Sequence, residues 1–332
     1  MIFRATAALA ALFTGLAIVP AASASSGPHC GDTISADVTL TQNLTCIGDG
    51  LHFVSPSSGS GSFKLNLAGH TLKGNGTGKG ITADNDQLSI VNGTITGFAT
   101  SIRGYAHSIA LTRVKISKTS SWLALPGVTD ATVVDSRFVD AGSGGASSDA
   151  YLKVNNSKFV RTNIKSASEG DTFIYNSRFT EGNISATFLY ASGNVINSCP
   201  AGQAAGIQVD GMNMGLGRIT GNTVHRCMAG ISVVAPILPT TIEGNLVSRT
   251  GTGIVYSLNS AAATIAITGN VLTKNSEGLA GWGDGTATIT ANSTSKNTNA
   301  GITVTGANVI DGGGNTATGN GAVPACVGVV CE

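Results

Sequence analysis

Apolar residues recur along this chain in a short phrase that returns every 22 to 25 residues. The phrase reads Ile-Thr-Gly-Asn-x-Val or a close variant, and it is clearest in four segments, 219–224, 242–247, 267–272 and 289–294. Each phrase is rich in strand-forming residues, and glycine interrupts it before an apolar run reaches helical length. The pattern predicts a solenoid of short β-strands, in which each repeat forms one coil and buries its apolar face by stacking on its neighbours.

One apolar position marks the same place in every repeat, and we call it the landmark. The landmarks are Leu72, Ile95, Ile116, Phe138, Phe159, Phe179, Ile196, Val224, Val247, Leu272, Thr294 and Ala317. Only the steps on either side of Ile196 depart clearly from the period, and these two deviations cancel. The series predicts one all-β domain of about twelve coils, with equivalent residues stacked about 4.8 Å apart.

A polar residue lies two positions before most landmarks. It is serine in three repeats and asparagine in the six that follow, namely Ser136, Ser157, Ser177, Asn194, Asn222, Asn245, Asn270, Asn292 and Asn315. Stacked asparagine amides can hydrogen-bond from coil to coil, which satisfies donors that would be costly to bury unpaired. We therefore expect a structural ladder, and we expect His70, which holds this position in an early repeat, to be structural too.

A second strand recurs between the phrases and begins with Gly-Ile at residues 80, 206, 230, 253 and 301. Because side chains alternate along a strand, the isoleucine faces inward and the residue after it faces outward. This alternation places Thr82, Gln208 and Thr303 on an outer face. Parallel sheets wrapped around a narrow apolar core are the expected architecture.

Composition agrees with tight stacking and restricts the expected partners. Charged residues make up 11% of the 332-residue chain, against roughly 25% in average proteins. Apart from Arg4, the basic residues equal the 18 acidic ones in number, and no basic stripe is visible along the sequence. Nucleic acid and anionic membranes are therefore not expected as partners.

Residues 1–24 have the features of a secretory signal peptide. Arg4 precedes an apolar run, and Ala-Ser-Ala at 22–24 forms a cleavage site. We expect cleavage after Ala24, free extracellular secretion and a monomeric protein. The expected organisation is an N-terminal cap at 25–50, a parallel β-helix at 51–318 and a C-terminal disulfide-tied tail at 319–332.

Six cysteines suit an exported protein. Two of them, at 199 and 227, each lie three positions after a landmark on successive coils, so their Cα atoms are expected at disulfide distance. The predicted disulfides are Cys199–Cys227, Cys30–Cys46 in the N-terminal cap and Cys326–Cys331 in the tail. Buried free thiols are the alternative, and no histidine spacing accompanies the cysteines to indicate a metal site.

The sequence resembles a known superfamily in several segments. The leader, the Cys-Gly-Asp-Thr-Ile start at 30–34, the phrase Leu-Asn-Leu-Ala-Gly-His-Thr-Leu at 65–72 and the asparagine-rich coils resemble secreted right-handed parallel β-helix proteins of the pectin-lyase-like superfamily. The resemblance covers about residues 28–331. It implies three strands per coil, an N-terminal cap, a groove along one outer sheet and extracellular polysaccharide as the commonest ligand, although one fold hosts many functions.

The catalytic patterns of that superfamily are absent. A polygalacturonase-like site would need Asn-Thr-Asp, Asp-Asp, Gly-His-Gly and Arg-Ile-Lys, and only partial matches occur, at 69–71 and 163–165. The Trp-x-Asp-His phrase of pectate-lyase-like enzymes and the Tyr-Gly-x-Asp-Pro-His phrase of epimerase-like ones are missing as well. The sequence therefore leaves open whether the protein is an enzyme.

Polar outward positions nevertheless concentrate in the N-terminal half. The candidate catalytic residues are Asp84, Arg103, His107, Lys165 and Glu169. In β-elimination from a uronate, a carboxylate or calcium neutralises the sugar carboxylate while Arg or Lys takes the α-proton, so Asp84 beside Arg103 could form such a pair. A solvated face with ion pairs between coils is the alternative, and no cofactor is expected unless a lyase uses calcium.

Four further residues are candidates for substrate binding, namely Tyr105, Gln208, Asp210 and Trp282. An aromatic ring can stack on the C–H face of a sugar, and alternation from Leu279 points the indole at 282 outward. Trp122 is instead expected to support the core or a loop.

These observations lead to three hypotheses about function. The first is recognition of an extracellular polysaccharide along the exposed sheet of the N-terminal half. The second is a lyase or hydrolase acting on uronate-rich glycans, and the third is a structural or adhesive surface protein.

Overall fold

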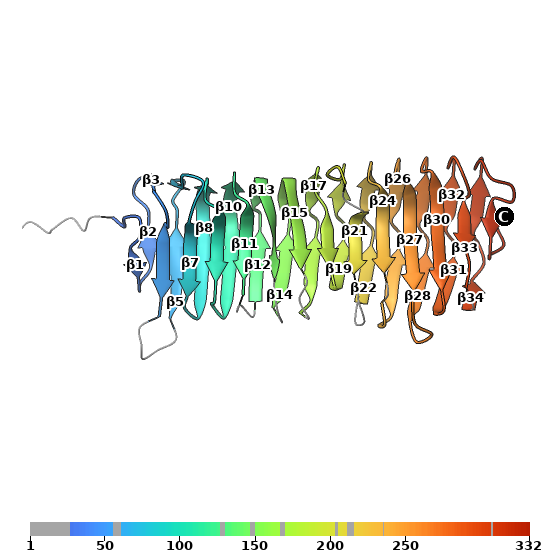
Figure 1. Cartoon of the computed structure of the whole chain (residues 1–332), viewed down its shortest axis with the longest axis horizontal. Coiled ribbons are helices and arrows are strands. Elements are labelled where there is room, and N and C mark those ends of the chain that lie inside the picture. Colours follow the sequence, from blue (N-terminus) through green and yellow to red (C-terminus); the bar gives the residue numbers. More distant parts are fainter. Residues whose placement is uncertain are drawn as a thin grey trace, which may run out of the picture.

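The computed structural model describes residues 27–55, 61–126, 130–146, 150–166, 170–202, 205–210, 216–234, 236–306 and 308–332. Within these ranges the chain forms 36 β-strands and no helix, and it winds into an elongated right-handed parallel β-helix (Figure 1). The predicted signal peptide lies outside the described residues. In the described part of the chain, no helix is long and apolar enough to span a membrane.

Three parallel sheets run the length of the molecule. Sheet 1 contains β1 (Thr33–Ile34), β4 (Leu51–Val54), β7 (Lys79–Asp84), β9 (Thr100–Gly104), β11 (Ser121–Leu125), β18 (Ile184–Ala186), β21 (Ala205–Asp210), β24 (Ala229–Val234), β27 (Thr252–Leu258), β30 (Glu277–Gly283), β33 (Ile302–Val304) and β36 (Cys326–Val327). Sheet 2 contains β2 (Val38–Thr39), β5 (Ser62–Asn66), β12 (Asp130–Val134), β14 (Tyr151–Asn155), β16 (Thr172–Tyr175), β19 (Phe188–Ser192), β22 (Leu216–Thr220), β25 (Thr240–Glu243), β28 (Thr264–Thr268), β31 (Thr286–Thr290) and β34 (Asn308–Asp311).

Sheet 3 is made of the shortest strands. It contains β3 (Leu44–Thr45), β6 (Thr71–Lys73), β17 (Arg178–Thr180), β20 (Val195–Ile196), β23 (Thr223–His225), β26 (Leu246–Ser248), β29 (Val271–Thr273), β32 (Ser293–Ser295) and β35 (Thr316–Thr318). Four long strands turn a corner. Of these, β8 (Gln87–Thr96) and β10 (Ser108–Ser117) pass from sheet 2 into sheet 3, while β13 (Arg137–Ala146) and β15 (Lys158–Ser166) pass from sheet 3 into sheet 1.

The predicted register is confirmed along the whole solenoid. Every landmark pairs with the next one, from Leu72 opposite Ile95 to Thr294 opposite Ala317. One further coil precedes the first landmark, because β1, β2 and β3 pair with β4, β5 and β6. The apolar side chains thus stack in a continuous column inside the coils.

Aromatic rings fill the middle of the core. The rings of Phe138, Phe159 and Phe179 stack with centroids 4.7 Å apart at each step. The indole of Trp122 is fully buried against the first of them, at 4.6 Å between ring centroids. The expected supporting role of this tryptophan is therefore confirmed.

The asparagine ladder forms as predicted. The side-chain oxygen of Asn245 accepts hydrogen bonds from the backbone and side-chain amides of Asn222, at 2.9 and 3.0 Å, and its own amide donates to Asn270 at 2.9 Å. The serines continue the column, since the backbone amide of Ser157 donates to the hydroxyl of Ser177 at 3.1 Å. Each member is buried, so the column satisfies polar groups that water cannot reach.

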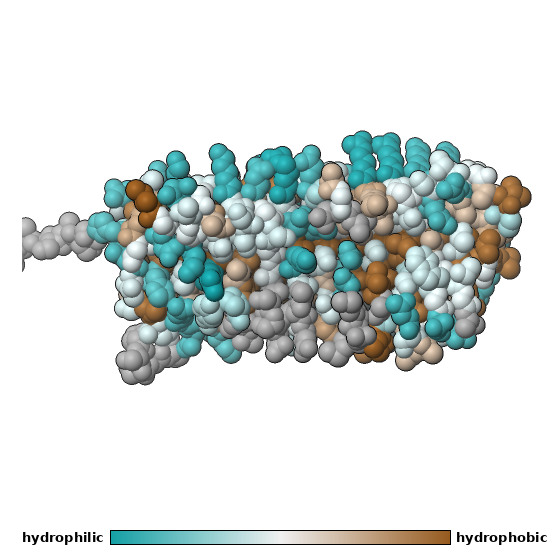
Figure 2. Space-filling model, viewed as in Figure 1, coloured by the Kyte–Doolittle hydropathy of each residue, from teal (hydrophilic) through white to brown (hydrophobic). Residues whose placement is uncertain are grey.

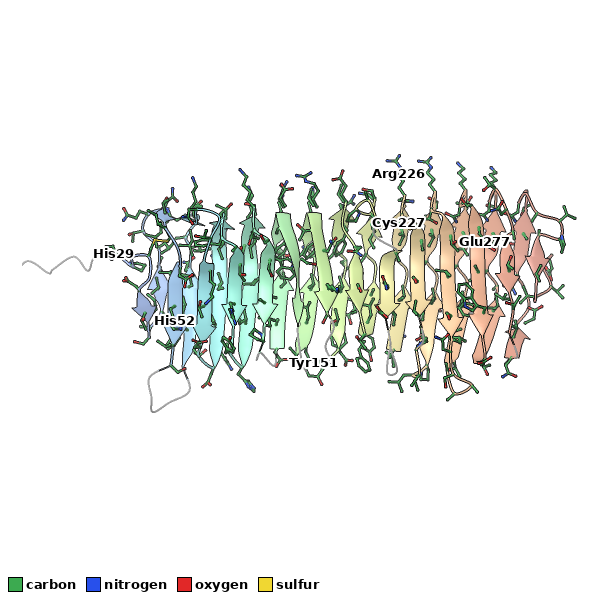
Figure 3. All side chains as sticks on the ribbon, in the orientation of Figure 1. His29, His52, Tyr151, Arg226, Cys227 and Glu277 are labelled. Carbon is green, nitrogen blue, oxygen red and sulfur yellow. A yellow bond between two sulfur atoms is a disulfide. The ribbon has the colours of Figure 1, made fainter. Side chains whose placement is uncertain are left out.

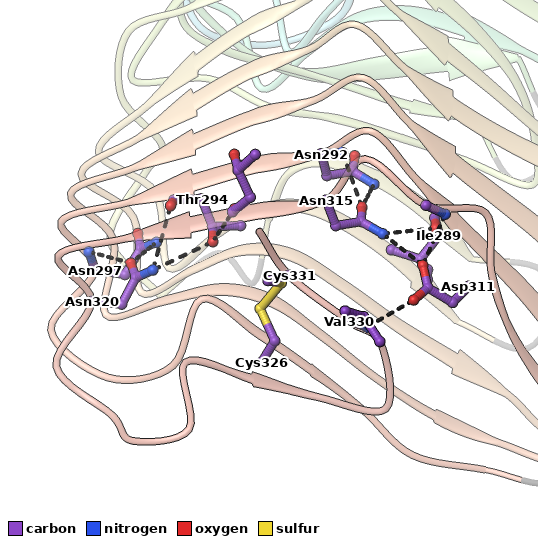
Figure 4. The surroundings of a disulfide bond; sticks show 12 residues. Ile289, Asn292, Thr294, Asn297, Asp311, Asn315, Asn320, Cys326, Val330 and Cys331 are labelled. Carbon is purple, nitrogen blue, oxygen red and sulfur yellow. Dashed lines mark hydrogen bonds between the residues drawn. A yellow bond between two sulfur atoms is a disulfide. The ribbon is translucent and has the colours of Figure 1, made fainter.

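A second ladder lies at the other end of the last sheet 3 strands, three positions after the landmark. The side-chain oxygen of Asn275 accepts from the backbone amide of Thr250, and Asn297 is bonded in the same way to Asn320, as Figure 4 shows for the last coils. Earlier in the column the same place is held by Cys199 and Cys227. Both corners of sheet 3 are therefore fixed from the inside.

The six cysteines form the three predicted disulfides, Cys30–Cys46, Cys199–Cys227 and Cys326–Cys331. The central disulfide joins successive coils with its Cα atoms 5.0 Å apart, as the register requires. The last disulfide closes the C-terminal tail (Figure 4).

Replacing Asn245 with alanine should destabilise the coil stack by about 2–4 kcal/mol, because buried amides on both neighbouring coils lose their partners. The matched control is Leu246→Ala, one position along the chain on the exposed side, which should change stability by less than about 0.5 kcal/mol. Urea unfolding followed by circular dichroism measures both, and equal losses in the two variants would contradict a structural ladder.

Candidate functional site

The outer face of sheet 1 gathers most of the residues that the sequence identified as candidates. Its outward side chains form two parallel columns. The first column runs through His52, Thr82, Arg103, Ala124, Gly145, Lys165, Ser185 and Gln208. The second lies two residues further along each strand and includes Asp84, Tyr105, Asp210 and Trp282.

An open cavity of about 460 Å³ lies at the N-terminal end of this face. His52 and Asp84 meet there, with 2.7 Å between Nε2 and Oδ2. On the coil after Asp84 the Arg103 guanidinium donates a hydrogen bond of 2.7 Å to the Tyr105 hydroxyl, and the Tyr105 ring is half exposed. The cavity thus combines a carboxylate–imidazole pair, a guanidinium and an accessible phenol.

His52 was missed by the sequence analysis. It lies opposite Thr82 in the structure, but 30 residues separate the two along the chain. The first coils are longer than the average repeat, so counting back by one period does not reach this histidine. The available signal was the alternation in 51–54, where His52 stands between the buried residues Leu51 and Phe53.

A second cavity of about 310 Å³ lies further along the same face. Lys165, Gln208 and Asp210 line it, together with side chains such as Ser185 and Asn183. Ser185 pairs with Lys165 on one side and with Gln208 on the other. Ser143 on the preceding coil also lines it, so this cavity is built from four successive coils.

The candidate catalytic residues are divided between the two cavities. Ala124 and Gly145 occupy the coils between Arg103 and Lys165, which places the two cations three strand spacings, or about 14 Å, apart. The side chain of Asp84 pairs with His52, while Arg103 bonds to Tyr105. Lys165 therefore cannot act together with Asp84 and Arg103 on one bond of a substrate.

Two other candidates lie elsewhere. His107 is exposed in the turn after β9, and its backbone carbonyl accepts a hydrogen bond from the amide of Asp130. Glu169 falls outside the described residues.

Trp282 stands on the same column as Asp210, three coils further on, and half of its surface is exposed.

The chain was compared with known proteins. The family described as periplasmic copper-binding protein (NosD) matches residues 166–331, which is half of the chain. The chain belongs to the NosD family.

The structure is similar to that of a mutant of the periplasmic alginate epimerase AlgG, with a TM-score of 0.55 and 12% identity over 82% of this chain and 78% of that one. An A-module of a mannuronan C-5 epimerase from Azotobacter vinelandii matches with a TM-score of 0.38 and 11% identity, over 87% and 84% of the two chains. The likeness to AlgG shows a shared fold. Among curated proteins, no match was found.

The family is described as copper-binding, so a member that binds copper needs a group of side chains that can hold the ion. Across the described ranges, no three His, Cys, Asp or Glu side chains come together in a metal-binding group. All six cysteines are in disulfides, and the pair formed by His52 and Asp84 supplies only two ligands. These residues do not fit a copper site, and they also lack the carboxylate cluster that calcium requires.

The outer side of sheet 3, with its two corners, carries a band of positive charge. Twelve of the 19 basic residues lie in it, namely Lys73, Arg113, Lys115, Lys118, Arg137, Lys158, Arg161, Arg178, Arg226, Arg249, Lys274 and Lys296. Only Asp135, Asp140 and Glu181 accompany them among the described acidic residues. The expectation that the chain has no basic stripe is therefore wrong, because the stripe forms only when coils stack.

Two of the three acidic residues of this band, Asp140 and Glu181, lie against a cation. The guanidinium of Arg161 donates to both oxygens of Asp140, one of the bonds being 2.9 Å long, and it approaches Glu181 at 4.0 Å. These hydrogen bonds hold the pKa of the Asp140 carboxyl below its usual value.

The Arg161→Gln substitution should return the pKa of Asp140 towards the ordinary aspartate value. Since the folded pKa is the lower one, the stabilisation is present above the unfolded pKa and is lost as the pH falls through the folded pKa. Titration of the side-chain carboxyl carbon by NMR measures this shift. Arg178→Gln, at an exposed position without contact to Asp140, should leave the pKa unchanged, and an equal change in both variants would count against the contact.

Proposed function

We propose that the protein binds a polysaccharide outside the cytoplasm, along the outer face of sheet 1. The observation that carries the proposal is the alignment of two polar cavities and two exposed aromatic rings on one sheet face. The three disulfides favour an oxidising compartment, which agrees with export. The periplasmic placement named for the family and for AlgG supports the same compartment.

The side chains of this face suit a sugar polymer. Tyr105 and Trp282 offer half-exposed rings on which the C–H face of a pyranose can stack. Hydrogen-bond donors and acceptors for sugar hydroxyls are provided by Lys165, Gln208 and Asp210. Eight strand spacings separate the two rings, so the track is about 38 Å long and spans several sugar units.

The Trp282→Ala variant should bind polysaccharide about two- to tenfold more weakly, because a stacked ring contributes about 0.5–1.5 kcal/mol. Ile310→Ala is the matched control, since this side chain is also half exposed but lies on sheet 2. Affinity electrophoresis in gels containing alginate, polygalacturonate or a neutral glucan measures the effect. If the native protein is retarded by none of these polymers, or if the two variants behave alike, the proposal is wrong.

The N-terminal cavity also supports a second function, which is proton abstraction beside a uronate carboxylate. Asp84 orients the imidazole of His52, which takes the proton α to the carboxylate. Arg103 neutralises the negative charge of the enolate that develops. The Tyr105 hydroxyl, held by the guanidinium, is placed to donate a proton to the leaving oxygen. The contacts of 2.7 Å within each pair favour this assignment.

If the cavity is a lyase site, incubation with polyuronates should produce an unsaturated sugar that absorbs in the ultraviolet. Arg103→Ala should reduce the rate by at least about a hundredfold, because it removes the charge that stabilises the intermediate. Arg218→Ala, on sheet 2, removes the same charge away from the cavity and should leave the rate unchanged. Absence of the chromophore with every polyuronate would exclude elimination and leave binding alone.

A further inference from the structure

Four basic residues occupy one position in four consecutive coils. Arg226, Arg249, Lys274 and Lys296 each lie two residues after a landmark, at the corner that follows sheet 3. All four side chains are exposed, and strand pairing sets them about 4.8 Å apart along the solenoid. Figure 2 shows a row of hydrophilic side chains along this edge, and Figure 3 labels Arg226 there.

This row has no acidic partners. Within the part of the chain that the structure describes, none of the four cations forms an ion pair, whereas in the earlier coils the same corner alternates Asp140, Arg161 and Glu181. Four like charges at one strand spacing repel one another. The arrangement is therefore not explained by interactions within the protein.

The backbone at the row is left-handed. The four residues have φ between +54° and +58°, a left-handed conformation that glycine adopts without steric strain. Glycine is found at this corner in other coils, at Gly97 and Gly319, and at the opposite corner of the same coils, for example Gly244. Lys118, Asp140, Arg161 and Glu181 adopt the same conformation at this corner of earlier coils, so it is a property of the coil, and glycine can replace the cations without changing the backbone.

A polar column runs beside the cations and completes a site. His225, Ser248 and Thr273 each stand one residue before a cation of the row, and Asn197 holds the same place on the preceding coil. Together with Arg226, Arg249 and Lys274 they line an open cavity of about 550 Å³. The imidazole of His225 is hydrogen-bonded to the hydroxyl of Ser248 at 2.6 Å. The cavity therefore offers cations on one side and neutral donors and acceptors on the other.

The corner is rigid from within. Directly after the cations, the inward positions are held by the Cys199–Cys227 disulfide and by the second ladder, in which Asn275 and Asn297 are buried and hydrogen-bonded. A row of charges on a fixed support binds a complementary polymer with little loss of backbone freedom.

The spacing of the charges selects the ligand. One strand of B-DNA carries a phosphate about every 3.4 Å of its axis, which is closer than the strand spacing of about 4.8 Å. A 1→4-linked polyuronate carries one carboxylate per pyranose ring, and the ring advances the polymer by nearly one strand spacing. The hydroxyl groups of the polyuronate would also hydrogen-bond to the polar column. A phosphate backbone would leave that column without partners.

We propose that this row of four cations and the polar column beside it form a binding site for a linear polyuronate, with one sugar unit per coil. The site lies on sheet 3 and its corner, apart from the face of sheet 1, so it does not depend on the function proposed for that face. The carboxylates on the side of the polymer that faces the row contact its Arg and Lys side chains, and the ring hydroxyls bond to the polar column.

The test replaces Arg249 and Lys274 together with glycine. Because glycine suits the left-handed backbone, the double variant should be at least as stable as the native protein, while its affinity for polygalacturonate and polymannuronate oligomers should fall about tenfold. The matched control is Lys158→Gln with Arg178→Gln, which removes the same charge from sheet 3 away from the cavity, and its affinity should change less than about threefold.

NMR locates the ligand in the same experiment. The ring signals of His225 should shift when polygalacturonate oligomers are added to the native protein, and they should not shift in the double glycine variant. Shifts confined to Tyr105 and Trp282 would place the polymer on sheet 1, overturning this site while supporting the other proposal.

Two further outcomes would also overturn the proposal. Equal loss of affinity in the two double variants would mean that total charge, and not this row, attracts the polymer. Tighter binding of a DNA duplex than of polygalacturonate at the same salt concentration would assign the row to a different polyanion.

Discussion

Hydrogen bonding along the stacking direction is the constraint on which the rest of this structure depends. Backbone bonds join each strand to its equivalents in adjacent coils, and the buried amide column through Asn222, Asn245 and Asn270 permits one register only. A slip of one residue would turn every core side chain outward. The central disulfide, the three cavities and the row of cations all exist because this register holds for the full length of the molecule.

The same register produces two chemically different surfaces. Sheet 1 presents neutral and mixed polar groups between two aromatic rings, whereas sheet 3 concentrates positive charge at its corners. The side chains that differ between these surfaces make few contacts with the core. Membership of the NosD family and the fold shared with AlgG therefore describe the scaffold, while ligand choice depends on the outward residues of each coil.

The fold was largely predictable because its signal is local and repeated. Each landmark, each ladder asparagine and the pairing of Cys199 with Cys227 follows from counting residues within the repeat. The site was less predictable, since lateral neighbours depend on coil length. His52 was missed because the first coils are long, and Ala124 and Gly145 separate Arg103 from Lys165 although all four share one column. The basic row was hidden because its members are more than 20 residues apart and the total charge nearly cancels.

The segregation of charge in a nearly neutral chain has a physical consequence for how the molecule meets a polymer. With a formal charge of +1 and its cations gathered along sheet 3, the rod carries a dipole directed across its long axis. Net attraction at long range is small, but the field of an extended polyanion exerts a torque that turns the rod until this edge faces the polymer. The protein therefore approaches the polymer with its basic edge facing it before any contact forms. This orientation weakens as salt shortens the Debye length.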